Sequence, residues 1–157
     1  MKSFLVMVGR TDDEWLGRGM DNYIKRIERY GPFKTIVIQD IKKAASMPEN
    51  VLKEKEGEAI LKNIAQGDVL VLLDERGKQR TSREFAAFIQ KIMLAGTKNL
   101  YFVIGGAYGF SEAVYNRADH KISLSLMTFP HQLVRLLFAE QLYRAHSILN
   151  KEPYHHD

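Results

Sequence analysis

Five consecutive residues in the second half of the chain have the composition of a ligand-binding loop. Residues 105–109 read Gly-Gly-Ala-Tyr-Gly, and glycine lets a backbone approach a ligand closely and adopt positive φ angles. The spacing differs from the Gly-x-Gly-x-x-Gly of dinucleotide-binding folds, and no Gly-Lys-Ser/Thr follows to indicate a phosphate loop. The pattern therefore predicts either a cofactor loop or a tight turn from a strand to a helix.

A second segment, residues 124–129, is apolar but carries hydroxyl groups, which is unusual for a loop. Its backbone amides and carbonyls could hold the edge of a flat heteroaromatic ring while leucine and methionine side chains cover the faces. Plain packing in the core is the alternative interpretation. The candidate binding residues are Leu124, Ser125, Leu126, Met127, Thr128 and Phe129.

His131 and Arg135 offer polar groups just beyond this segment. They are four residues apart, so on a helix they would lie on one face. There they could contact an anionic or polar substrate. The alternative is a surface histidine beside a structural pair between Arg135 and Glu140, and the sequence alone does not separate these two interpretations.

The chain ends in Pro153-Tyr154-His155-His156-Asp157. Tyr154 could stack on a base, and the imidazoles titrate near neutrality and could accept a proton. Adjacent histidines at a chain end are usually solvated, so we expect no metal site here. The chain has no cysteine, which excludes thiolate catalysis and cysteine-based zinc sites.

The elements expected to position these residues alternate between strands and helices. The expected strands cover residues 2–8, 33–38, 69–73, 100–104 and 121–124. The expected helices run from 12–14 to about 30, from 49 to 65, from Thr81 or Ser82 to Gly96, from Ser111 over a few residues, and from about Pro130 to Leu149. This order predicts an α/β domain with a mainly parallel sheet.

In open α/β sheets, ligands bind beyond the carboxyl ends of the strands. Three segments of this chain meet that criterion: residues 73–77, expected to form a polar loop after Leu73, residues 105–109 and residues 124–129. The sequence therefore predicts that these segments share a binding site.

Length and charge set broader limits. The 157 residues suit a single domain over 1–157, and 45% of them are apolar, as in ordinary globular proteins. The formal charge of +4 permits a polyanionic partner without requiring one. No apolar stretch approaches the length of a membrane span, and the apolar run after Ser3 is too short for a secretory signal. We expect a cytoplasmic protein without a membrane partner.

Four segments together resemble one known family. They are Phe-Val-Ile-Gly-Gly-Ala-Tyr-Gly at 102–109, Leu-Ser-Leu-Met-Thr-Phe-Pro-His-Gln-Leu-Val-Arg at 124–135, Glu-Gln-Leu-Tyr-Arg-Ala at 140–145 and Pro-Tyr-His at 153–155. Their order and spacing resemble the ribosomal large-subunit methyltransferase H family of the SPOUT class, and the likeness extends over essentially the whole chain.

This resemblance implies an α/β fold with a deep trefoil knot in the C-terminal segment. It implies a homodimer with each pocket for S-adenosylmethionine near the subunit interface, and no metal. The implied reaction is methylation of N3 of a pseudouridine in helix 69 of 23S rRNA within the assembled ribosome. The implied cofactor contacts are Leu73, Gly105, Gly106 and residues Leu124, Ser125, Leu126, Met127, Thr128 and Phe129.

The resemblance also assigns roles at the substrate end. The N3–H of pseudouridine is a weakly acidic imide that must lose its proton as the nitrogen attacks the methyl group. His131 and His155 are the candidate bases, and the sequence does not choose between them. Arg135 would bind phosphate or the developing imide anion, because guanidinium does not titrate usefully, and Tyr154 would stack on or position the substrate.

The sequence departs from the family pattern at one point, and three alternative functions are consistent with parts of it. The family often has a strongly basic residue after the Tyr-His pair, whereas here His156 and Asp157 follow, so a tail contact with RNA would be weaker or pH-dependent. The first rival is a SPOUT methyltransferase with another substrate, such as a tRNA base. The second is a non-catalytic RNA-binding or ribosome-assembly protein. The third, a Rossmann-type nucleotide enzyme, lacks its fingerprint.

Overall fold

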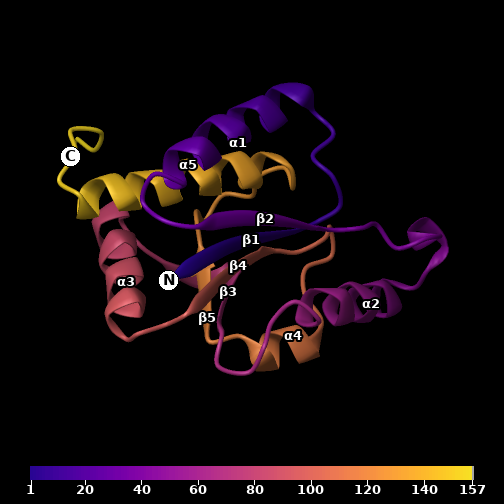
Figure 1. Ribbon diagram of the computed structural model, residues 1–157. Coiled ribbons are helices and arrows are strands. Elements are labelled where there is room, and N and C mark those ends of the chain that lie inside the picture. Colours follow the sequence, from indigo (N-terminus) through magenta and orange to yellow (C-terminus); the bar gives the residue numbers. More distant parts are fainter. Residues whose placement is uncertain (157) are drawn as a thin grey trace.

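The computed structural model describes residues 1–156, and its centre is a sheet of five strands (Figure 1). The strands are β1 (Lys2–Val8), β2 (Phe33–Ile38), β3 (Val69–Gln79), β4 (Asn99–Ile104) and β5 (His120–Ser123). Their order across the sheet is β2-β1-β4-β3-β5, and every neighbouring pair is parallel. The expected α/β fold with a parallel sheet is confirmed.

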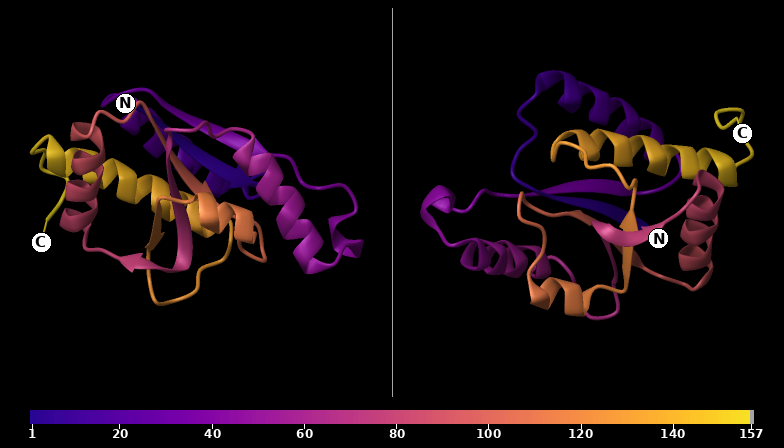
Figure 2. Two further views of the ribbon diagram at one scale, coloured as in Figure 1. Left: turned by 90° about the horizontal axis from the view of Figure 1, so that it is seen from below. Right: turned by 180° about the vertical axis from the view of Figure 1, so that it is seen from behind.

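Helices cover both faces of this sheet, as the two further views in Figure 2 also show. One face carries α1 (Glu14–Ile27), α3 (Ser82–Leu94) and α5 (Leu133–Leu149), with α5 packed against both of the others. The other face carries α2 (Glu49–Leu61) and α4 (Glu112–Arg117), which pack against each other. A short 3-10 helix, η1 (Ala44–Ser46), lies between β2 and α2.

The central strands read as continuous apolar runs because both faces of the sheet are buried. Side chains alternate between the faces along a strand, so Leu5 of β1 packs on the α1–α3–α5 side and Val6 packs on the α2–α4 side. On the first side, the ring of Phe102 lies 4.8 Å from that of Phe138 in α5. This contact fixes α5 over the middle of the sheet.

The start of α3 is fixed by a capping box, as its sequence predicts. The backbone N–H of Glu84 donates to Thr81 Oγ1 at 3.2 Å, and the backbone N–H of Thr81 donates to Glu84 Oε2 at 2.8 Å. Two otherwise unpaired helix-end donors are thereby satisfied. Thr81, rather than Ser82, is the capping residue.

β3 extends further than expected, because the strand runs to Gln79 and includes the expected polar loop. Its pairing is interrupted there: Leu73 and Lys78 both pair with Ile122 of β5, and residues 74–77 have no partner in the sheet register. A Cβ atom built on Gly77 would lie 2.5 Å from the backbone of Ile122, and only glycine permits this approach. The polar segment therefore leaves the ladder after Leu73, as expected, but the strand resumes at Lys78, which the sequence did not predict.

Two predicted helix ends also differ from the structure. α2 ends at Leu61, four residues before Ala65, because the guanidinium of Arg117 donates to the carbonyls of Ala65 and Asp68 at 3.0 and 2.8 Å and holds a turn there. α5 begins at Leu133, so Pro130 precedes the helix and is not its first residue.

No helix within residues 1–156 is long and apolar enough to cross a membrane. After β5 the chain passes back beside the end of β1, where His131 and Arg135 contact the backbone. A knot formed by this returning segment stays a prediction.

Candidate functional site

A cavity of about 590 Å³ lies at the carboxyl ends of β3, β4 and β5. Its wall includes Ile104 and Ser123, from the ends of β4 and β5, and Leu73, the point at which the pairing of β3 is interrupted. Residues 105–109 and the loop after β5 complete it. The three segments selected by the strand-end rule are thus brought together around one space.

Eight of the nine residues predicted to bind the cofactor line this cavity: Leu73, Gly105, Gly106, Leu124, Ser125, Met127, Thr128 and Phe129. The exception is Leu126, whose side chain is 88% exposed and is not part of the wall. The loop turns the side chain of Leu126 toward solvent, and its cofactor contact stays a prediction.

Hydroxyl groups give the loop after β5 its shape. Ser123 Oγ donates to the carbonyl of Ser125 at 2.8 Å, and the backbone N–H of Met127 donates to Ser125 Oγ at 2.9 Å. These serines hold the turn with local hydrogen bonds of the kind that compete with regular structure. Their spacing explains why an apolar segment forms a loop here.

The glycine loop is both a tight turn and part of the cavity wall. The backbone N–H of Gly109 donates to the carbonyl of Gly106 at 3.1 Å, and Gly109 has a φ of +80°. A Cβ atom on Gly105 would lie 2.9 Å from the ring of Phe110, and one on Gly106 would lie 2.5 Å from the carboxylate of Glu56. The two interpretations of this sequence are therefore compatible.

A carboxylate and a phenol face each other on one side of the cavity. Tyr115 Oη donates to Asp74 Oδ2, and both residues line the wall together with Glu75. Burial and the hydrogen bond to Asp74 raise the pKa of Tyr115 to about 12. Tyr115 was not among the site residues predicted from the sequence. Its position four residues after Ser111, the N-cap of α4, indicated only that it belongs to this helix.

Arg135 and His131 do share a face of α5 and they contact each other. Arg135 is completely buried, and its guanidinium donates to the carbonyls of Val8 and Gly9 at 2.5 and 3.0 Å and to Thr11 Oγ1 at 3.0 Å. Its Nη2 lies 2.9 Å from His131 Nε2. Nε2 also lies 3.4 Å from the carbonyl of Val8. Because arginine has only donors, the shorter contact with Arg135 assigns Nε2 as the acceptor and places the hydrogen of the neutral ring on Nδ1.

This geometry changes the predicted role of Arg135. A buried guanidinium that donates to backbone carbonyls of its own chain does not reach a phosphate or an anion in the cavity, so the predicted anion contact is not supported. His131 itself is half-buried and lines the cavity. Burial first, and the nearby charge of Arg135 second, lower the pKa of His131, which favours the neutral ring.

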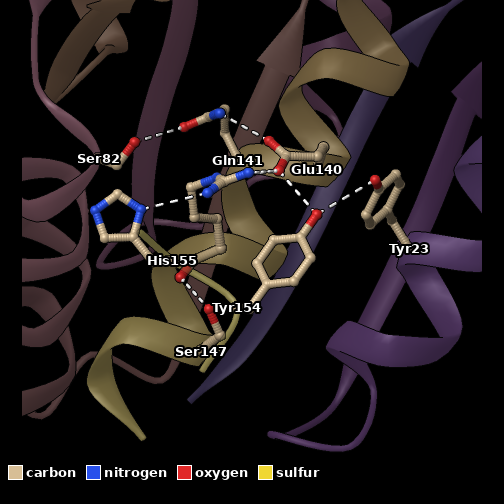
Figure 3. A network of polar contacts seen from close by, with 8 residues as sticks. Tyr23, Ser82, Glu140, Gln141, Ser147, Tyr154 and His155 are labelled. Carbon is tan, nitrogen blue, oxygen red and sulfur yellow. Dashed lines mark hydrogen bonds and ion pairs between the residues drawn. The ribbon is translucent and has the colours of Figure 1, made fainter. Parts of the chain in front are cut away.

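The C-terminal residues form a separate polar network on α5 and α1 (Figure 3). Tyr154 Oη donates to Glu140 Oε1 at 3.0 Å and lies 3.4 Å from Tyr23 Oη. The guanidinium of Arg144 lies 4.8 Å above the ring of Tyr154, and its Nη1 donates to His155 Nδ1 at 3.3 Å. Burial, followed by the hydrogen bonds to Tyr23 and Glu140, raises the pKa of Tyr154.

This network lies away from the cavity of the same chain. Arg144 is nine residues beyond Arg135, which corresponds to about 13 Å along a helix. Neither Tyr154 nor His155 is part of the cavity wall. The structure therefore brings His131 to the cavity and leaves Tyr154 and His155 at the other end of α5.

Metal ligation finds no support in the part of the chain that the structure describes. No group of three or more histidine, cysteine, aspartate or glutamate side chains in residues 1–156 is arranged to hold a metal ion. His156 is exposed, and the other possible ligand at the chain end, Asp157, lies outside the described residues.

Comparison with known proteins defines the class of protein. A family profile described as "Predicted SPOUT methyltransferase" matches residues 1–155. The chain belongs to this SPOUT methyltransferase family. Solved structures of a probable methyltransferase from Bordetella pertussis (TM-score 0.57, 13% identity, 92% and 94% of the two chains) and of a probable methylase family protein from Haemophilus influenzae (0.52, 12%, 99% and 70%) share its fold.

Closer relatives carry a more specific name. The chain is 52% identical over 157 residues, the full length of both proteins, to the ribosomal RNA large subunit methyltransferase H of Parabacteroides distasonis. It is 55% identical over 152 residues, 97% of each protein, to the protein of that name from Christiangramia forsetii.

SPOUT methyltransferases use S-adenosylmethionine as methyl donor, and the cavity fits this molecule. Its volume lies within the usual range for small-ligand pockets. Ile104, Leu124 and Val134 offer apolar contacts, and the glycine loop offers backbone groups. The carboxylates of Asp74 and Glu75 favour a ligand that carries positive charge, as a sulfonium does.

Proposed function

We propose that this protein is an S-adenosylmethionine-dependent methyltransferase that methylates N3 of a pseudouridine in helix 69 of 23S rRNA. The observation that carries the donor site is the cavity, whose wall contains His131 and eight of the nine predicted cofactor residues. The identity of about half of all residues to proteins named ribosomal RNA large subunit methyltransferase H supports the substrate. The whole chain, 1–157, acts as one domain in the cytoplasm.

The cavity residues have separable tasks in this reaction. The glycine loop and the cavity-lining residues of the loop after β5 hold the donor, which supplies an electrophilic methyl group when bound. The walls exclude water and align the nitrogen with the methyl group, because positioning alone can lower such a barrier considerably.

His131 acts as a hydrogen-bond donor toward the substrate. Its Nε2 accepts from Arg135, so the neutral ring presents Nδ1–H as its donor group. A donor at a carbonyl of the uracil ring stabilises the negative charge that develops when N3 loses its proton. Arg135 is then a positioning residue for His131. His155 is the other candidate base, and its Nδ1 must be released from Arg144 before it can take the proton.

The protein acts as a homodimer in which the tail of one subunit serves the cavity of the other. The separation of Tyr154 and His155 from the cavity of their own chain supports this arrangement. Mixing His131→Ala and His155→Ala subunits should restore about a quarter of wild-type activity, because half of the dimers then hold one intact site. No restoration would contradict a shared site.

The assembled ribosome is the proposed substrate particle. The described residues 1–156 form one α/β unit around a five-stranded sheet, and in this proposal the shape of the target supplies the specificity. Equal methylation of ribosomes and of protein-free rRNA fragments would contradict this part of the proposal.

Mass spectrometry of 23S rRNA from a deletion strain tests the function. The strain should lack one methyl group on a helix 69 pseudouridine, and the wild-type gene should restore it. His131→Ala and Gly105→Trp should not restore it, whereas Lys62→Ala, at an exposed site after α2, should. An unchanged 23S rRNA would overturn the proposal, and loss of a tRNA methyl group instead would indicate the rival substrate.

A further inference from the structure

A second hollow, of about 610 Å³, lies along α3 and the neighbouring ends of β3 and β5. We name it the α3 groove. It is lined by the cationic residues Lys78, Arg80 and Lys91 together with His120, and by one acidic residue, Glu84. Nothing in the reaction described above uses these side chains.

The arginine of this groove packs over an aromatic ring. The guanidinium of Arg80 lies 4.6 Å above the ring of Phe88, and the ring of His120 meets Phe88 edge-on at 5.0 Å. Arg80 Nε is buried and has no hydrogen-bond partner within residues 1–156.

The single acid does not cancel the positive charge of the groove. The carboxylate of Glu84 accepts the backbone N–H of Thr81 in the capping box, and this backbone hydrogen bond lowers the pKa of Glu84. Three cationic side chains therefore face one carboxylate that already has a structural task. A polyanion is the ligand that such a surface attracts.

The α3 groove and the cavity lie at the two ends of the same short strand, β5. His120, at the start of β5, lines the groove, whereas Ile122 and Ser123, at the end of the same strand, line the cavity. Four residues of strand span about 10 Å. Lys78 lies directly beside Ile122 in the sheet, and β5 is the edge strand next to α3 (Figure 1). An RNA strand with one nucleotide in the cavity would reach the groove within one or two nucleotides.

We propose that the α3 groove binds the phosphodiester backbone of the RNA substrate next to the target nucleotide. This inference rests on the proposed function, because it requires an RNA substrate. Lysine and arginine contacts with phosphates supply much of the affinity for nucleic acids and position the target without reading its bases. A guanidinium stacked on a ring keeps its planar set of donors available for phosphate oxygens.

Charge reversal in the groove tests this inference. Lys78→Glu and Lys91→Glu alter exposed side chains, and Lys62→Glu changes the net charge equally at a site outside both hollows. The measurements are binding of a helix 69 stem-loop RNA at several salt concentrations, methyl transfer to large ribosomal subunits from the deletion strain, and donor affinity. Light scattering establishes the oligomeric state of each variant.

Each groove variant should weaken RNA binding about tenfold at low salt and reduce the slope of log Kd against log salt by about one. KM for ribosomal subunits should rise, while kcat and the affinity for S-adenosylmethionine should stay at wild-type values. Lys62→Glu should change RNA binding less than twofold.

Three results would overturn the inference. An unchanged salt slope in the groove variants would exclude a phosphate contact while wild-type methyl transfer keeps the proposed function intact. A raised KM for ribosomal subunits with unchanged binding to the stem-loop would indicate a ribosomal protein as the partner. Dissociation of Lys91→Glu into monomers would indicate a subunit interface. Absence of methyl transfer by the wild type would instead contradict the proposed function, and RNA binding would still test the groove.

Discussion

The cavity and the C-terminal network both include residues of α5, but the side chains of the two regions differ in burial and in hydrogen-bond partners. At the start of α5, Arg135 is completely buried and donates to backbone carbonyls, while His131 remains open to the cavity. At its other end, Glu140, Arg144 and Tyr154 pair with one another on a partly exposed surface.

The difference shows which of the predicted site residues a single chain brings together. The cavity is formed at strand ends whose positions the sheet dictates, so a single chain brings these wall residues together. The network satisfies Tyr154 and His155 locally, and their proposed work requires a second subunit. The predictions below test this contrast, beginning with the largest expected effect.

The two arginines should differ most in their effect on stability. Arg135→Met leaves the carbonyls of Val8 and Gly9 without donors, and we expect the free energy of unfolding to fall by about 4 kcal/mol. Arg144→Met removes a partly exposed pair with Glu140 and should cost about 1 kcal/mol. Urea unfolding of both variants measures the difference. Equal losses would contradict the contrast between a buried and a surface guanidinium.

A tryptophan in the loop after β5 should block the donor site. Thr128 is exposed and lines the cavity, so Thr128→Trp fills the space without entering the core. Calorimetry should show the affinity for S-adenosylmethionine falling about 100-fold, or about 2.7 kcal/mol.

Leu126→Trp is the matched control, since Leu126 lies two residues earlier and is not part of the cavity wall. It should leave the donor affinity within about twofold of wild type. A similar loss in both variants would mean that the whole loop, rather than the cavity, determines binding.

Much of the cavity could be predicted from the sequence because its cause is local. The apolar runs at 69–73 and 100–104 place the residues that follow them at one edge of a parallel sheet. Leu126 could not be predicted as an exception, since its orientation depends on the hydrogen bonds of Ser125 to its neighbours. A loop has no regular periodicity, so its sequence does not indicate which side chains face the cavity.

Long-range partners explain the other misses. The burial of Arg135 depends on carbonyls more than 120 residues earlier in the chain, and no spacing along the sequence indicates such a contact. The extension of β3 depends in the same way on the backbone of β5, which approaches Gly77 closely. Both features are products of the assembled sheet.

His131 should make the fold sensitive to acid. Its pKa is lowered by burial and by Arg135, so below about pH 6.5 the unfolded chain takes up a proton at this imidazole that the folded chain does not. The free energy of unfolding therefore decreases as the pH falls through this range. In His131→Gln, the decrease between pH 7.5 and 5.5 should be smaller than in wild type. Parallel curves for the two proteins would contradict the burial of a neutral ring.

The smallest effect is expected for Tyr154→Phe, and it separates the two regions most directly. The change removes hydrogen bonds to Glu140 and Tyr23 but keeps the ring below Arg144, so unfolding should become easier by only about 0.5–1 kcal/mol. Donor affinity should equal that of wild type, because Tyr154 is proposed to act on the RNA substrate and not on the donor. Methyl transfer to ribosomes should nevertheless decrease, since the proposed role of the tail is at the partner's cavity. Weaker donor binding would show instead that the network supports the donor site, and the division of α5 into two independent regions would then be wrong.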